Sequence, residues 1–239
     1  MAEPILQFEH AELRPVGKPA SILLDVTLML NAGESAVVDA SFSSDPALEL
    51  SDYFPLADAA QGLLPCDKGK ILFRGREWSS MPPLEQARCR GRIGRLFDFH
   101  GWIFNLEILE NILLACRIYP ERAVPNVEAE ALRLARRFGL DEIPPGRPAL
   151  VGRRELRRLE WVRAFLGGPD LVILEHPEMD MVSASLDALL ETAREAQRRG
   201  TALLWITHDR EMQERVLRLG GASYEIRNRT WWRRGETGR

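Results

Sequence analysis

The 239-residue sequence lacks the features that mark several classes of protein. Its three cysteines, Cys66, Cys89 and Cys116, are too few and too scattered for a disulfide framework or a zinc site. No apolar run approaches the length that spans a bilayer, and the first residues do not have the composition of a signal peptide. The formal net charge of −3 gives no global attraction to nucleic acid or to an anionic membrane. These absences favour a cytoplasmic globular protein that does not bind nucleic acid.

The most informative absence is that of a phosphate-binding loop. Such a loop follows a strand and reads G-x-x-x-x-G-K-[ST], so that backbone N–H groups and the Lys hold phosphates while the hydroxyl holds Mg²⁺. Here the strand-like residues 35–40 lead into residues 41–50, which contain neither Gly nor Lys. That segment carries Asp45 and Glu49, whose charges would repel a triphosphate. The Gly-Lys pairs elsewhere, at 17–18 and 69–70, are not followed by Ser or Thr.

The sequence does contain strand-like segments that alternate with helix-like ones, which predicts an α/β fold with a largely parallel sheet. Continuous apolar runs at residues 171–174 and 202–206 are typical of strands that are buried on both faces. In residues 24–30 the inward-type residues alternate with Asp25, Thr27 and Met29, which predicts a half-exposed antiparallel strand. Residues 84–150 are predicted to form a helical lobe that is inserted between two parts of the core.

Five groups of segments, in order along the chain, resemble parts of the ATP-binding subunits of ABC transporters. They are the strand and turn that lead to the strand of the phosphate-binding loop (22–33), the link after the loop's helix (62–65 and 69–75), the glutamine loop region (92–97 and 105–113), the signature helix with the Walker B strand (156–165 and 168–174), and the switch-histidine strand (204–209). The resemblance implies one ABC-type cassette over residues 1–239. Its expected fold is a P-loop NTPase-like α/β core with a mostly parallel sheet, an antiparallel β subdomain and an inserted helical lobe.

The resemblance also identifies the Walker B position, where the family has Asp-Glu and this chain has Glu175 and His176. Glu175 could reach Mg²⁺, and His176 could act as a base because its ordinary pKa lies near neutrality. We interpret both as residues tolerated at a site without nucleotide, since a base is useless without a held γ-phosphate. Together with His208 and Glu178 they could converge near the strand ends, but their spacing matches no metal motif, and we expect no metal.

Two further positions of the nucleotide site lie in loops after strands. Asp98 replaces the Gln of the glutamine loop; it could accept a hydrogen bond from Mg²⁺-bound water but could not donate one, and we expect a solvated loop acid. His208 matches its family counterpart, the switch histidine, outright. Two interpretations of His208 stay open, a retained functional role and a simple hydrogen bond within the core.

Gly152, Arg153 and Arg154 stand where the family has its signature motif, LSGGQ. In that motif, small residues at a helix N-terminus let backbone N–H groups approach the γ-phosphate in the partner cassette. The two arginines add bulk at the point of close approach. They could still supply positive charge to a phosphate, or they could pair with acids such as Asp180 or Glu175 across an interface that no longer holds nucleotide. We favour the second interpretation.

Residues 97–118 resemble the family's docking surface for transmembrane subunits. The segment is rich in apolar and aromatic residues, among them Phe99, Trp102, Ile103 and Phe104. The last three are adjacent, and neither period 2 nor period 3.6 can bury all three inside one domain. We therefore expect at least one of them to face outward and to contact a partner. The alternative is that they form the core of the helical lobe.

These observations predict a non-catalytic ABC cassette, a pseudo-ATPase that has lost the binding of ATP and Mg²⁺ and needs no cofactor. It would be a structural or regulatory subunit of a membrane transport complex, held at the inner face of the cytoplasmic membrane by permease subunits and paired with a second cassette. Two alternatives remain open. The chain could complete a partner's composite ATPase site through Arg153 and Arg154, or it could be a soluble dimeric scaffold that reuses the fold.

Overall fold

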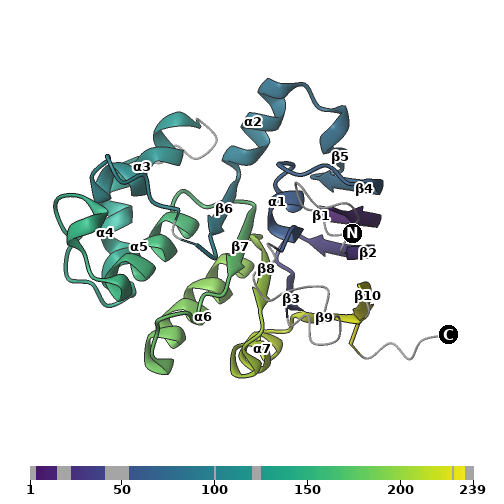
Figure 1. The fold of residues 1–239 in the computed structure, drawn as a ribbon. Helices are drawn as coiled ribbons and strands as arrows, with labels where there is room; N and C mark the ends of the chain where they lie inside the picture. Colours follow the sequence, from purple (N-terminus) through teal and green to yellow (C-terminus); the bar gives the residue numbers. More distant parts are fainter. Residues whose placement is uncertain are drawn as a thin grey trace.

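A single sheet of ten strands forms the centre of the protein, in the order β5-β4-β1-β2-β10-β9-β3-β8-β7-β6 (Figure 1). The structure is a computed structural model that describes residues 4–14, 23–40, 54–99, 101–119, 125–227 and 229–234. The strands are β1 (Pro4–Leu13), β2 (Leu23–Asn31), β3 (Ser35–Asp39), β4 (Lys68–Phe73), β5 (Arg76–Glu77), β6 (Ile93–Leu96), β7 (Leu171–Glu175), β8 (Ala202–Thr207), β9 (Ala222–Arg227) and β10 (Thr230–Arg233).

The sheet has a parallel half and an antiparallel half. Strands β9, β3, β8, β7 and β6 run parallel to one another, whereas β5, β4, β1 and β2 form antiparallel pairs. The two halves meet at β10, which pairs antiparallel with β9 and parallel with β2, where Thr230 lies opposite Leu24. The predicted fold class, a mostly parallel α/β sheet with an antiparallel β subdomain, is thereby confirmed.

The apolar pattern of the strands explains which faces are covered. Every residue of β7 and of β8 is buried, as the continuous apolar runs predict for strands covered on both sides. In β3, Ala36 and Val38 pack into one hydrophobic cluster and Val37 into the other, because successive side chains point to opposite faces. In β2 the exposed positions are Asp25, Thr27 and Met29, which confirms the half-exposed antiparallel strand.

Helices cover the sheet and project from one side of it (Figure 1). The helical segments are α1 (Leu56–Ala60), η1 (Trp78–Ser80), α2 (Pro83–Gly91), α3 (Ile108–Ile118), α4 (Val127–Arg137), η3 (Pro148–Leu150), α5 (Arg153–Phe165), α6 (Ser183–Arg198) and α7 (Arg210–Leu217). The expected lower boundary of the helical lobe, residue 84, is too early. β6 lies inside the range 84–150, yet it pairs with β7 as part of the sheet, so the projecting lobe of α3 and α4 begins only after β6.

Candidate functional site

The carboxyl ends of β6, β7 and β8 bring together four of the residues singled out in the sequence. Adjacent parallel strands end at the same edge of a sheet, so Asp98 after β6, Glu175 and His176 at the end of β7, and His208 after β8 become neighbours. The imidazole rings of His176 and His208 lie 4.7 Å apart between centroids. The predicted convergence at the strand ends is therefore present for these two histidines.

Arg95, which no sequence pattern indicated, binds several side chains at this edge of the sheet. It projects from β6, and its Nε donates to Glu175 Oε1 at 2.6 Å. Its Nη1 donates to Gln61 Oε1 at 2.9 Å and to the Asp58 carboxylate, both next to or within α1. Arg95 and Glu175 are only 7% and 5% exposed. The Glu175 carboxylate thus forms an ion pair within its own chain, and Arg153 or Arg154 of another chain would compete with Arg95 for it.

The carboxylates of this network stabilise the charged form of Arg95. Burial by itself lowers the pKa of Arg95, but the hydrogen bonds and negative charges of Glu175 and Asp58 outweigh it and raise that pKa. The guanidinium also lies over the ring of Phe97, 4.5 Å from the ring centroid. A buried cation with two carboxylate partners and an aromatic face is therefore built into the position where the sequence predicts a vestigial nucleotide site.

Around His176 lies a second group, which we call the histidine–carboxylate cluster: Asp98, His176, Glu178 and His208. Glu178 Oε1 accepts a hydrogen bond of 2.5 Å from Thr207 Oγ1 and lies 3.6 Å from His176 Nδ1. Asp98 is half-buried and not a solvated loop acid, since its Oδ1 is buried without a hydrogen-bond partner among the described residues. His208 is exposed, so the core interpretation of this residue is wrong. In the described part of the chain, no three His, Cys, Asp or Glu residues are arranged to hold a metal ion.

Arg157 of α5 binds the backbone at the carboxyl ends of β6 and β7. Its Nη1 donates to the carbonyl of Phe97 at 2.8 Å, and its Nη2 donates to the carbonyls of Glu175 at 2.9 Å and His176 at 2.5 Å. The same Nη1 donates to the buried carboxylate of Glu160, one turn along the helix, at 3.0 Å. The backbone that carries the candidate site is therefore tied to α5 by one buried guanidinium.

The signature-like residues lie at the start of the same helix. Gly152 is the N-cap of α5, and Arg153 and Arg154 form its first turn. All three are exposed, and so is Asp180, the other acid expected to face these arginines. Residues 41–50, where the sequence predicts that the phosphate-binding loop is missing, lie outside the described residues, so their predicted lack of a phosphate nest stays a prediction.

The expected docking residues divide into exposed and buried ones. Phe99, Ile103 and Phe104 are 83%, 42% and 62% exposed, and we call these three the docking surface. Ile103 lines a groove of about 290 Å³ together with Ile118 and other residues of α3. Trp102 is only 5% exposed and packs within the core, with the Arg163 guanidinium 5.2 Å from its ring centroid. Its inclusion among outward-facing docking residues is therefore wrong, whereas the expectation that at least one of the three adjacent residues faces outward holds for Ile103 and Phe104.

No known protein-family model matches this sequence. Solved structures, however, resemble the chain over nearly its full length. One is the ATP-binding subunit of an ABC transporter, with a TM-score of 0.77 and 20% identity over 95% of this chain and 87% of that one. The fold is that of an ABC transporter cassette. Two further matches are dimeric structures of the bacterial cassette MJ0796, one of them bound to ADP and phosphate after hydrolysis; each has a TM-score of 0.78 and 17% identity over 97% of this chain and 100% of that one.

The cassette fold allows the carboxyl ends of β6, β7 and β8 to be compared with the predicted motifs. β7 contains the residues predicted to form the Walker B strand, and β3 precedes residues 41–50, the predicted counterpart of the phosphate-binding loop; both assignments of function stay predictions. At sequence identities of 20% or less, these structural matches establish the fold alone. The activity of this chain therefore has to be argued from its own side chains. Among the described residues, no helix is both long and apolar enough to cross a bilayer.

Proposed function

We propose that this chain is a non-catalytic ABC cassette, a pseudo-ATPase that acts as a structural or regulatory subunit of a membrane transport complex. The observation that supports it most directly is the buried bond between Arg95 and Glu175. Glu175 stands at the Walker B position, where an acid would orient Mg²⁺. A guanidinium bound to that carboxylate neutralises it and repels a second cation. To bind Mg²⁺ there, the protein would have to break the ion pair and leave Arg95 buried with less compensation.

The sequence of the loop after β3 supports the same proposal. Residues 41–50 offer neither the Lys nor the glycine-rich backbone that would cradle a triphosphate, and they include two acids, Asp45 and Glu49. Catalysis of phosphoryl transfer depends almost entirely on holding the phosphates and the metal in position. Without groups that hold the phosphates and the metal, His176 has no reaction to catalyse. The residues at this edge therefore do not fit Mg-ATP.

The first prediction is that the purified chain shows no stabilisation by Mg-ATP. A ligand present at 100 times its Kd raises the free energy of unfolding by about 2.7 kcal/mol, which a thermal-shift titration detects readily. We expect the melting temperature to stay constant up to millimolar Mg-ATP. A saturable increase that requires Mg²⁺ would contradict the proposal, and the same titration with ATP in excess chelator serves as its control.

A complex with two kinds of partner is part of the proposal. Both MJ0796 structures are dimeric, which supports a second cassette as one partner. The exposed arginines at the start of α5, Arg153 and Arg154, leave positive charge available to such a neighbour. The docking surface supports the other partner, a permease, because large apolar side chains as exposed as Phe99 and Phe104 mark interaction sites when they cluster.

The second prediction separates docking from packing by two neighbouring aromatic residues. Phe104→Ala is expected to weaken co-purification with the permease and to leave the melting temperature of the chain nearly unchanged, since the ring is mostly exposed. Trp102→Ala is the matched control, and we expect it to cost about 3–5 kcal/mol of stability because it empties a core site. The docking assignment fails if Phe104→Ala leaves the composition of the purified complex intact.

A further inference from the structure

The turn that connects β7 to α6 is held in an unusual conformation. His176, its first residue, has a positive φ of 42°, which side chains other than glycine rarely adopt. Its N–H donates to the Ile206 carbonyl at 2.8 Å, and its own carbonyl accepts from Met179 N at 3.0 Å. Met181 N donates to the Glu178 carbonyl at 2.9 Å. Because the His176 backbone is strained, contacts outside the turn must keep it in place.

The end of β8 supplies contacts of this kind, and the side chains of the turn take part in them. His176 and Glu178 have side chains that are only 13% and 15% exposed, with Nδ1 and Oε1 3.6 Å apart. Thr207 Oγ1 donates to the same Glu178 oxygen from the end of β8. The other carboxylate oxygen, Oε2, is buried and has no hydrogen-bond partner among the described residues. An ionised Glu178 therefore depends on a cationic His176 as its nearby counter-charge.

We propose that His176 and Glu178 form a protonation-dependent latch that fixes the turn between β7 and α6 to the end of β8. With a proton on both ring nitrogens, His176 is a cation that offsets the buried carboxylate and holds the turn closed. Loss of that proton leaves Glu178 ionised, buried and short of one partner, so the turn loosens. The proposal does not depend on the proposed function, because it concerns contacts within this chain and needs neither nucleotide nor transporter.

The groups that surround His176 favour its charged form. Three carboxylates act on it from different elements: Asp98 after β6, Glu175 at the end of β7, and Glu178 in the turn. His208, after β8, faces it with its ring, and Arg157 of α5 contacts only its carbonyl. Burial lowers the pKa of His176, but the Glu178 carboxylate 3.6 Å away and the other neighbouring carboxylates outweigh it, so that this pKa is raised. His176 therefore has more carboxylates than cations facing its ring.

The sign of the pH dependence follows from both partners. A histidine whose folded pKa is raised stabilises fully below its ordinary pKa of about 6.5 and stops stabilising as the pH rises through the raised value. Burial raises the pKa of Glu178, but the positive charge of His176 and the hydrogen bond from Thr207 outweigh that and lower it. Its stabilisation is therefore present above the ordinary pKa of about 4.3 and is lost only as the pH falls through the lowered value. The latch is closed between these limits and opens on the alkaline side.

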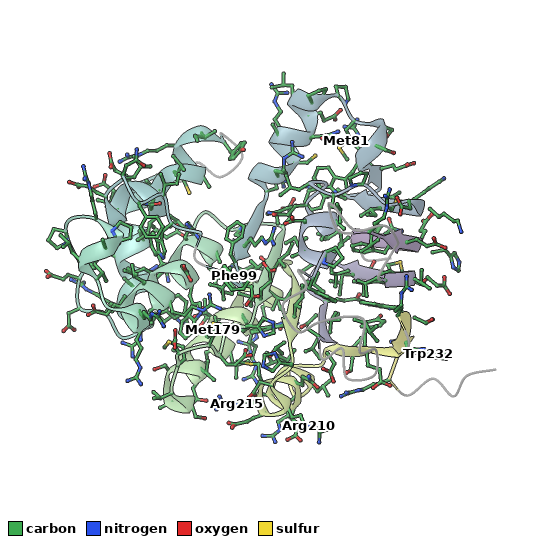
Figure 2. All side chains as sticks on the ribbon, viewed as in Figure 1. Met81, Phe99, Met179, Arg210, Arg215 and Trp232 are labelled. Atoms are coloured by element: carbon green, nitrogen blue, oxygen red, sulfur yellow. The ribbon has the colours of Figure 1, made fainter. Side chains whose placement is uncertain are left out.

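The test combines an NMR titration of the histidine ring protons with amide hydrogen exchange of the full chain. We expect His176 to titrate above its ordinary pKa. We expect the protection factors of the Met179 and Met181 amides to fall as the pH rises above the ordinary histidine pKa of about 6.5, by about tenfold for each unit of the pKa difference. Met179, which is labelled in Figure 2, is 42% exposed, so its release needs no wider unfolding. A His176 that titrates at or below its ordinary pKa, or protection that does not change with pH, overturns the latch.

Two substitutions assign the effect to the named pair. Glu178→Gln removes the charge and keeps an acceptor for Thr207, and we expect it to lower the pKa of His176 and to abolish the pH dependence of protection. His208→Asn changes the neighbouring, exposed ring, and we expect it to leave the pH dependence in place. If Glu178→Gln leaves both readouts unchanged, or if His208→Asn alone abolishes them, the assignment to His176 and Glu178 is wrong. The wild-type titration decides the matter even if a variant fails to fold.

Discussion

Replacing Arg95 with methionine is expected to lower the free energy of unfolding by about 3–5 kcal/mol, because it leaves the buried Glu175 carboxylate without its counter-charge. Methionine keeps much of the side-chain volume, so the loss reflects the missing charge and hydrogen bonds more than a cavity. Asp58 and Gln61 lose the same donor. For a chain of this size the melting temperature should fall by about 6–20 °C. Denaturant unfolding followed by circular dichroism measures both quantities.

Two further variants distinguish the buried pair from an ordinary surface contact. The double substitution Arg95→Met with Glu175→Gln should recover a large part of the loss, since it removes both charges together. Arg92→Met, just before β6, is the matched control: its partner Asp170 is also bound by Arg74, and all three side chains reach solvent. We expect Arg92→Met to cost about 1 kcal/mol or less. Equal losses for Arg92 and Arg95 would show that the buried network has no special role.

Replacing Arg157 with methionine is expected to destabilise the protein by a similar amount, about 3–5 kcal/mol. Arg157 is 3% exposed and is the cation beside Glu160, which is fully buried. The substitution also removes the donor for the carbonyls of Phe97, Glu175 and His176. Since these carbonyls belong to the ends of β6 and β7, amide exchange should accelerate there before it does elsewhere in the sheet.

The neighbouring residue on α5 provides the control for this second prediction. Arg158 is half-buried and donates to the Gly139 carbonyl and to Ser185 Oγ, both at 3.2 Å. Arg158→Met removes hydrogen bonds but strands no buried charge, so we expect a loss of about 1 kcal/mol. If the Arg157 variant were no less stable than the Arg158 variant, the strand ends would be held by the sheet alone.

The fold was largely predictable from the sequence because its strongest signals are local. The apolar runs of β7 and β8 and the alternation in β2 depend only on residues within each strand, and the order of such segments limits the topology. The boundary of the helical lobe was less predictable. β6 has only four residues, one of them Arg95, so its sequence does not resemble a buried strand, although all four are buried.

The candidate site was predictable in its location but not in its bonds. The sequence placed Glu175, His176 and His208 at strand ends, where parallel strands bring side chains together. It did not reveal that Arg95 pairs with Glu175, because the partners are 80 residues apart and meet only through the register of β6 with β7. The signal in the sequence that could have indicated this pairing was Arg95 itself, a charged residue within the short buried strand β6. Trp102 was misplaced for a related reason: the loop after β6 turns it back onto α5, which no periodicity encodes.

The position of β10 inside the sheet has a consequence for how the chain is made. Thr230 and Leu24, whose pairing joins the two halves, are more than two hundred positions apart. The antiparallel half therefore emerges from the ribosome long before the strand that covers the free edge of β2. An uncovered edge recruits other strands, and closing so long a loop carries an entropic cost. A nascent copy thus remains open to mispairing with its neighbours on a polysome until almost all of its strands have been synthesised.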